Sequence, residues 1–306
     1  GMMLAEQVAE FYPDLMDERF ESAFAIYHQR YSTNTFPQWA LAQPFRMLAH
    51  NGEINTLKGN VNWMRSHEIR MASSAFGDKA EDIKPIIPSG ASDSSALDSV
   101  FEVLVRAGRK APVAITRMVR VAWSKQAVEM PLAWQDMYSY CNAVMEPWDG
   151  PAALAMTDGR WVCGGLDRNG LRPLRYVVTG DGLLVAGSEV GMVQIDEATV
   201  IEKGALGPGQ IIAVDMQEGK LFHDTELKDK LAAAQPFGEW VGKVVNLNEG
   251  LKDIPEVAVH ESEELRKRQV AAGYSIEELE QVLAPMAEDG KEMIASMGDD
   301  TPSAVL

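Results

Sequence analysis

Three successive segments with the pattern of a β-hairpin constrain the fold of this chain more than any other feature. In each segment, two short apolar runs flank a turn dipeptide that ends in glycine. The dipeptides are Asp158-Gly159, Asp181-Gly182 and Glu218-Gly219, within residues 150–167, 174–189 and 209–224. Glycine favours such turns because it adopts positive φ without strain. Consecutive hairpins form antiparallel sheet, so the sequence predicts an α+β fold rather than alternating βαβ units.

Apolar spacing predicts the other elements. In residues 93–108, apolar side chains recur at intervals of three and four, which indicates an amphipathic helix capped by Ser92 or Asp93 and ended by Gly108. Further helices are predicted in residues 55–68, 111–121, 131–144 and, as a helical tail, 262–297. Strands are predicted in residues 22–33 and 45–50, the second leading into an Asn51-Gly52 turn.

Composition narrows the class of protein. The 306 residues are 46% hydrophobic and 24% charged, which is typical of a soluble globular protein with a sizeable core. A net charge of −17 argues against nucleic acid or an anionic membrane as a partner. No apolar run is long enough to span a membrane. Cys141 and Cys163 are too few for a disulfide framework, and they favour structural thiols in a reducing cytoplasm.

Several common catalytic motifs are absent from the sequence. It contains no phosphate-binding G-x-x-x-x-G-K-[ST] loop, no G-x-S-x-G elbow and no H-E-x-x-H pair. It has no cysteine cluster for zinc or iron–sulfur, and its five histidines show no metal-ligand pairing. The sequence therefore predicts neither a metal site nor a redox cofactor within this chain.

Three polar features within predicted structural elements are candidates for a binding site. Arg30 lies in an apolar strand, where it forms either a structural salt bridge or a bidentate clamp on a substrate carboxylate. Asp93 is either a helix N-cap or the acceptor of a substrate ammonium group. Asn51-Gly52 is either a tight turn or a pair of donors for a developing oxyanion. Together they outline a site for an α-amino acid with chemistry at a carbonyl group.

Long sequence phrases carry a family resemblance. Four of them are STNTFP at 32–37, HNGEINT at 50–56, MEPWDGPA at 145–152 and LDRNGLRPL at 166–174. With these phrases the chain closely resembles the class II glutamine amidotransferase domain of the glutamate synthase large subunit, from about residue 11 onward. The last segment, MGDDTPSAVL at 297–306, resembles the entry to the central domain of that enzyme.

The resemblance implies a fold and an activity. The fold is a four-layer αββα sandwich of antiparallel sheets, of the N-terminal-nucleophile hydrolase type, here incomplete and followed by the helical tail. Residues 1–245 would form the partial amidotransferase domain, and residues 246–306 a helical linker with the start of the central domain. The activity is hydrolysis of the side-chain amide of L-glutamine. In the full enzyme the ammonia passes through a tunnel to 2-oxoglutarate, in a synthase part that carries FMN and an iron–sulfur cluster.

The resemblance also assigns roles to residues. Arg30 matches the residue that holds the α-carboxylate of glutamine, and Asp93 matches the one that holds its α-amino group. Asn51 and Gly52 match the oxyanion hole, through a side-chain amide and a backbone N–H. Ser32 and Thr33 would line the pocket.

One departure from the family pattern concerns the nucleophile. In the family it is a cysteine at the mature N-terminus, whose own amine is the general base. This chain begins Gly1-Met2-Met3, and neither of its cysteines matches that position. The sequence therefore predicts a chain that is inactive alone and works with a missing N-terminal segment and the synthase domains. The alternative is a non-catalytic glutamine-binding or scaffold module. Missing strands would leave sheet edges unpaired, so self-association is also expected.

Overall fold

The computed structural model describes most of the chain. The described residues are 4, 6–29, 38–71, 74–119, 121, 130–189, 191–245, 247, 262–290 and 292–293. The chain divides into one unit at Gly1–Val244 and another at Val245–Leu306, and each is described by itself.

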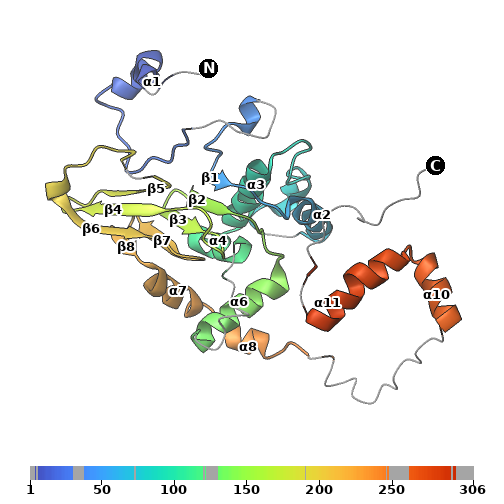
Figure 1. The fold of residues 1–306 in the computed structure, drawn as a ribbon. Helices are drawn as coiled ribbons and strands as arrows, with labels where there is room; N and C mark the ends of the chain where they lie inside the picture. The colour runs from blue at the N-terminus through green and yellow to red at the C-terminus, as the bar shows by residue number, and fades with distance from the viewer. Residues whose placement is uncertain are drawn as a thin grey trace. The chain divides into compact units, whose positions relative to one another are not determined.

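A five-stranded antiparallel sheet forms the centre of the first unit (Figure 1). Its strand order is β1-β2-β3-β7-β8. The strands are β1 (Leu48–Gly52), β2 (Ala152–Thr157), β3 (Trp161–Leu166), β7 (Ile211–Asp215) and β8 (Lys220–Phe222). The β2–β3 and β7–β8 connections are the hairpins predicted at Asp158-Gly159 and Glu218-Gly219, and both predictions are confirmed.

A second antiparallel sheet has the order β5-β4-β6. Its strands are β4 (Arg175–Thr179), β5 (Leu184–Gly187) and β6 (Val200–Ala205). The hairpin between β4 and β5 turns at Asp181-Gly182, as predicted, with Gly182 at a φ of 91°.

Helices cover one face of the five-stranded sheet. They are α2 (Leu57–Glu68), α3 (Asp93–Arg106), α4 (Ala111–Met118), α6 (Leu132–Val144), α7 (Asp224–Ala232) and α8 (Phe237–Val241). The main core forms where side chains such as Leu97 and Phe101 of α3 pack with Leu48, Leu154 and Met156 of the sheet. The helices predicted from apolar spacing at 55–68, 93–108, 111–121 and 131–144 are confirmed, each with one end unchanged and the other shifted by one to three residues.

A smaller core lies on the opposite face of the sheet. Ala153 and Leu166 of the sheet pack there with Leu174 and Leu206, which adjoin β4 and β6. The α+β class with two antiparallel sheets is thereby confirmed. Since Leu174 and Leu206 adjoin the second sheet, this smaller core lies between the two sheets, as the expected sandwich requires.

The other elements are short. In the first unit they are α1 (Gln7–Phe11) and 3-10 turns at Pro13–Met16, Trp39–Leu41, Gly77–Glu81 and Glu197–Thr199. In the second unit they are α10 (Ser262–Ala271), a π-helical segment at Glu278–Leu283 and α11 (Ala284–Asp289). None of the described helices combines the length and the apolar character needed to cross a bilayer.

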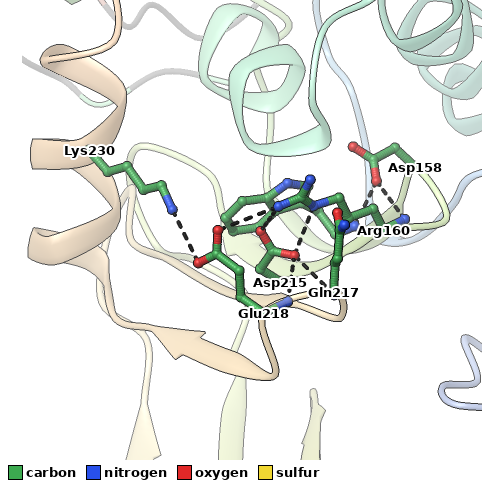
Figure 2. A network of polar contacts seen from close by, with 7 residues as sticks. Asp158, Arg160, Asp215, Gln217, Glu218 and Lys230 are labelled. Carbon is green, nitrogen blue, oxygen red and sulfur yellow. Dashed lines mark hydrogen bonds and ion pairs between the residues drawn. The ribbon is translucent and has the colours of Figure 1, made fainter.

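An ion-pair network fastens two hairpin turns to each other (Figure 2). The Arg160 guanidinium donates to both carboxylate oxygens of the buried Asp215, with its Nε at 2.9 Å and an Nη at 2.6 Å. It also lies 3.5 Å from Glu218, which pairs with Lys230 of α7 at 3.7 Å. The Asp158 carboxylate accepts from the backbone N–H of Ala111 at 2.7 Å, so the same turn holds the first residue of α4.

Two strand predictions need correction. Residues 22–29 contain no strand, although their apolar and aromatic composition favours one; residues 30–33 lie outside the described part. The strand predicted at 45–50 begins at Leu48 and continues through Asn51 and Gly52, which pair with Ala153 and Ala152 of β2. Interpretation of Asn51-Gly52 as a hairpin turn is therefore wrong, because β2 offers a ladder partner that a local turn does not.

Candidate functional site

The candidate site centres on the end of β1, where Asn51 and Gly52 lie partly exposed. Gly52 has a φ of 145°, a backbone conformation that only glycine adopts readily. A Cβ atom there would stand 1.7 Å from the carbonyl oxygen of Pro151. Glycine at 52 is thus required both by the backbone angle and by the close approach of the neighbouring loop.

That neighbouring loop brings two distant sequence phrases together. The backbone N–H of Glu53 donates to the Pro151 carbonyl at 2.9 Å, and that of Asn55 donates to the Asp149 carbonyl at 2.8 Å. A Cβ atom at Gly150 would stand 1.9 Å from the Glu53 carbonyl oxygen. The HNGEINT and MEPWDGPA phrases therefore form one interlocked structure, in which each contributes a glycine at the closest contact.

Helix α3 holds β1 at its start and just beyond its end. The buried Asp98 carboxylate accepts from the backbone N–H groups of Met47 at 3.0 Å and Leu48 at 3.1 Å, where the strand begins. Asp93 Oδ2 accepts from the backbone N–H of Ile54 at 2.8 Å, just beyond the strand. Burial raises the pKa of Asp98, and the backbone hydrogen bonds oppose that rise. The position of Asn51-Gly52 is thus set by two carboxylates one and a half turns apart on a single helix.

Asp93 is the first residue of α3 and is not its cap. The cap is Ser92, whose hydroxyl oxygen accepts from the backbone N–H of Ser95 at 3.1 Å. Of the two cap candidates in the sequence, Ser92 is therefore confirmed and Asp93 is not. The Asp93 carboxylate stays partly exposed at the helix N-terminus, where the helix dipole stabilises its negative charge.

His50, between Ala49 and Asn51, is a member of this region that the sequence analysis missed. Its side chain is 2% exposed, and its Nδ1 lies 2.8 Å from the hydroxyl oxygen of the buried Ser94 on α3. Burial lowers the pKa of His50, while the Asp93 carboxylate opposes that shift. The alternation of inward and outward side chains along β1 could have identified His50. It places this histidine at an inward position of an apolar strand, where it requires a polar partner.

Three predicted pocket residues cannot be placed against this geometry. Arg30, Ser32 and Thr33 lie outside the described residues. Arg168, from the LDRNGLRPL phrase, forms an ion pair of 2.5 Å with Asp149, which ties that phrase to the loop beside Gly52.

Neither cysteine forms a disulfide, and both are buried. Cys163 of β3 pairs with Met156 of β2. On the other edge of β2, Ala153 pairs with Asn51 of β1. Two strand spacings and three residues along the strand separate Cys163 from Asn51, or about 14 Å. Burial also raises the pKa of the Cys163 thiol, so it stays protonated. Neither property suits a nucleophile for a group held at Asn51-Gly52.

Comparison with known proteins decides the family. Residues 1–240 match the model of the class-II glutamine amidotransferases, and residues 267–306 match that of the glutamate synthase central domain. The chain belongs to the class-II glutamine amidotransferases. The resemblance carried by the sequence phrases is thereby confirmed.

The relatives of this amidotransferase chain are glutamate synthases. It is 62% identical to the NADPH glutamate synthase large chain of Azospirillum brasilense, over all of this chain and 20% of that protein. It is 43% identical to the NADPH glutamate synthase large chain of Bacillus subtilis, again over all of this chain and 20% of the relative. Identity to ferredoxin-dependent glutamate synthase 2 of Arabidopsis thaliana chloroplasts is 45%, over all of this chain and 19% of the relative. The chain thus spans about a fifth of the length of these relatives.

One solved structure shows a more distant likeness to this amidotransferase chain. It is the glutamine phosphoribosylpyrophosphate amidotransferase of B. subtilis complexed with ADP and GMP, at 20% identity and a TM-score of 0.31. The likeness covers 57% of this chain and 28% of that one. The family assignment rests on the sequence matches.

Proposed function

We propose that this chain supplies the glutamine-binding and oxyanion-stabilising part of a glutamate synthase. In the full enzyme, the side-chain amide of L-glutamine is hydrolysed and the ammonia passes to 2-oxoglutarate for glutamate synthesis and nitrogen assimilation. Membership in the amidotransferase family carries this proposal, together with relatives that are glutamate synthases over the whole of this chain.

In this proposal Asn51 and Gly52 stabilise the oxyanion that forms when the amide carbonyl is attacked. The donors are the Asn51 side-chain amide and the Gly52 backbone N–H, and fixed donors of this kind contribute roughly 3–4 kcal/mol each to transition-state stabilisation. The clamp of α3 on β1 supports the role, because it fixes the strand before the charge develops.

The same proposal assigns the α-ammonium and the α-carboxylate of glutamine to charged side chains of this chain. Asp93 receives the α-ammonium, and its partial exposure and remaining acceptor capacity suit that role. Arg30 holds the α-carboxylate as a bidentate clamp, and Ser32 and Thr33 line the pocket.

The nucleophile is proposed to come from outside these 306 residues. The family uses an N-terminal cysteine, whereas both thiols present here are buried and Cys163 lies about 14 Å from Asn51. This chain by itself is therefore expected to release no ammonia from glutamine. A non-catalytic glutamine-binding module is the second candidate, and the same burial of both thiols favours it.

The proposal also covers the domains and cofactors of the full enzyme. Residues 1–245 form the partial amidotransferase domain, and residues 246–306 form a helical linker and the start of the central domain. FMN and the iron–sulfur cluster are assigned to other domains of the full enzyme, and the two cysteines of this chain are too few to hold a cluster by thiolates alone. In the described part of the chain, no three His, Cys, Asp or Glu side chains gather where they could hold a metal ion. Two thiols that form no disulfide also favour a cytoplasmic location.

Ammonia release by the purified 306-residue chain tests the proposal. We expect no release above the buffer background, and Cys163→Ala and Cys141→Ala variants that behave like the parent chain. Turnover that either substitution abolishes would overturn the assignment of the nucleophile to another segment.

A further inference from the structure

A chain of polar contacts crosses the packed boundary between β1 and α3. It runs from His50 Nδ1 to the Ser94 hydroxyl oxygen at 2.8 Å, and from that hydroxyl to Asp93 Oδ1 at 3.3 Å. His50 is 2% exposed and Ser94 is 6% exposed, whereas the Asp93 carboxylate at the end of the chain is partly open to solvent. The contacts therefore connect a buried ring to the carboxylate proposed to hold the substrate amine.

The second ring nitrogen of His50, Nε2, is also buried. His50 Nε2 forms no hydrogen bond of normal geometry with any described residue, although it lies beside the Pro151 carbonyl. An unpartnered buried nitrogen is unfavourable, and an apolar side chain would pack between β1 and α3 without that penalty. The histidine at this position is thus not explained by packing.

The position of the His50 ring proton decides whether the Ser94 hydroxyl can donate to Asp93. Burial keeps the ring neutral by lowering the pKa of His50, so it carries a single proton, and the Ser94 hydroxyl carries one more. With the ring proton on Nδ1, Ser94 accepts from His50 and donates its own proton to Asp93 Oδ1. With the ring proton on Nε2, the only proton of Ser94 would point back at Nδ1, and Asp93 would lose that donor. The 3.3 Å contact between the Ser94 hydroxyl and Asp93 Oδ1 agrees with the first arrangement.

We propose that His50 and Ser94 are positioning residues that fix the Asp93 carboxylate for the α-ammonium of the substrate. Asp93 Oδ1 is held by the Ser94 hydroxyl and Oδ2 by the backbone N–H of Ile54, which leaves the outward lone pairs in one orientation. This inference rests on the proposed function, because it deepens the role given there to Asp93. His50 also precedes Asn51 in β1, so the residue that sets the amine site lies next to the oxyanion donors.

Comparing two ligands distinguishes a residue that positions Asp93 from one that only stabilises the fold. L-Glutamine carries the α-ammonium, and glutaramate is the same molecule without its α-amino group. Isothermal titration calorimetry of the 306-residue chain with both ligands measures how much affinity the amine contributes. A residue that acts only on Asp93 changes the affinity for L-glutamine and leaves that for glutaramate unchanged.

The variants are Ser94→Ala, His50→Leu and His50→Asn, with Ser99→Ala as the matched control. Ser99 lies on the same helix, and its hydroxyl donates to the Ser95 carbonyl at 2.9 Å rather than toward β1. We expect Ser94→Ala and His50→Leu to bind L-glutamine about tenfold more weakly, with no change for glutaramate. His50→Asn retains a donor near the Nδ1 position and is expected to recover part of the loss. Ser99→Ala is expected to bind both ligands like the parent chain.

The outcomes distinguish the two proposals. Equal losses for both ligands, or no loss in Ser94→Ala, would overturn the positioning role while leaving the proposed function standing. A folded parent chain that binds neither ligand would overturn the proposed function and this inference with it. Ser94→Ala removes a single oxygen, so it tests the role even where His50→Leu does not fold.

Discussion

Replacing Gly52 by alanine tests the geometry of the candidate site at its closest contact. The new Cβ would stand 1.7 Å from the Pro151 carbonyl oxygen, at a residue with a φ of 145°. The backbone angle alone costs about 1–3 kcal/mol for a residue other than glycine. Moving the Pro151 carbonyl to a normal contact distance also breaks its 2.9 Å hydrogen bond with Glu53, at about 1 kcal/mol, and repacks the loop at about 1–3 kcal/mol. The expected loss in the free energy of unfolding is about 3–7 kcal/mol.

Gly219→Ala is the matched control. Gly219 also has positive φ, at 61°, but a Cβ there would meet no atom within 4 Å. Only the left-handed conformation is then unfavourable, at about 1–2 kcal/mol. Urea unfolding followed by tryptophan fluorescence measures both variants, because all seven tryptophans precede residue 245 and report on the sheet unit. Equal stability of Gly52→Ala and Gly219→Ala would refute the interlocked loop.

Two further predictions concern the ion pair and the thiols. The Arg160 hydrogen bonds lower the pKa of Asp215 from 3.8 to about 2, so this carboxylate stabilises the fold above about pH 4 and loses that contribution as the pH falls toward 2. Arg160→Gln is expected to lower the free energy of unfolding at pH 7, and the difference from the parent chain is expected to shrink below about pH 4. A difference that stays constant down to about pH 2.5 would contradict this. Because both cysteines are buried and neither forms a disulfide, a thiol reagent such as DTNB is expected to label the native chain slowly and two thiols per chain in denaturant, and rapid native labelling would refute this.

The elements that follow from local chemistry were predictable from the sequence. The three hairpins depend on glycine turns within a few residues, and α3 depends on its own apolar stripe and on a serine cap. Each of these signals lies inside the element it specifies, and each is confirmed.

Elements that depend on distant partners were harder to predict. Residues 22–29 have the composition of a strand but form none in the part of the chain that the structure describes, because composition alone does not form a sheet. Asn51-Gly52 has the local signal of a turn, yet pairing with β2 extends it into a strand. The link from His50 through Ser94 to Asp93 joins residues 44 positions apart, and no local pattern contains it. Asp93 and Asn51-Gly52 were candidates from their residue types and places in the predicted elements, and the family resemblance assigned them roles.

Calorimetric titration of L-glutamine into the 306-residue chain tests the central claim most directly. The parent chain is expected to bind L-glutamine, and Asp93→Asn and Arg30→Ala to lose that binding. Asp196→Asn removes the same charge at the cap of the 3-10 turn Glu197–Thr199 and is expected to bind like the parent chain. Failure of the folded parent chain to bind L-glutamine, or unchanged binding in Asp93→Asn, would contradict the account.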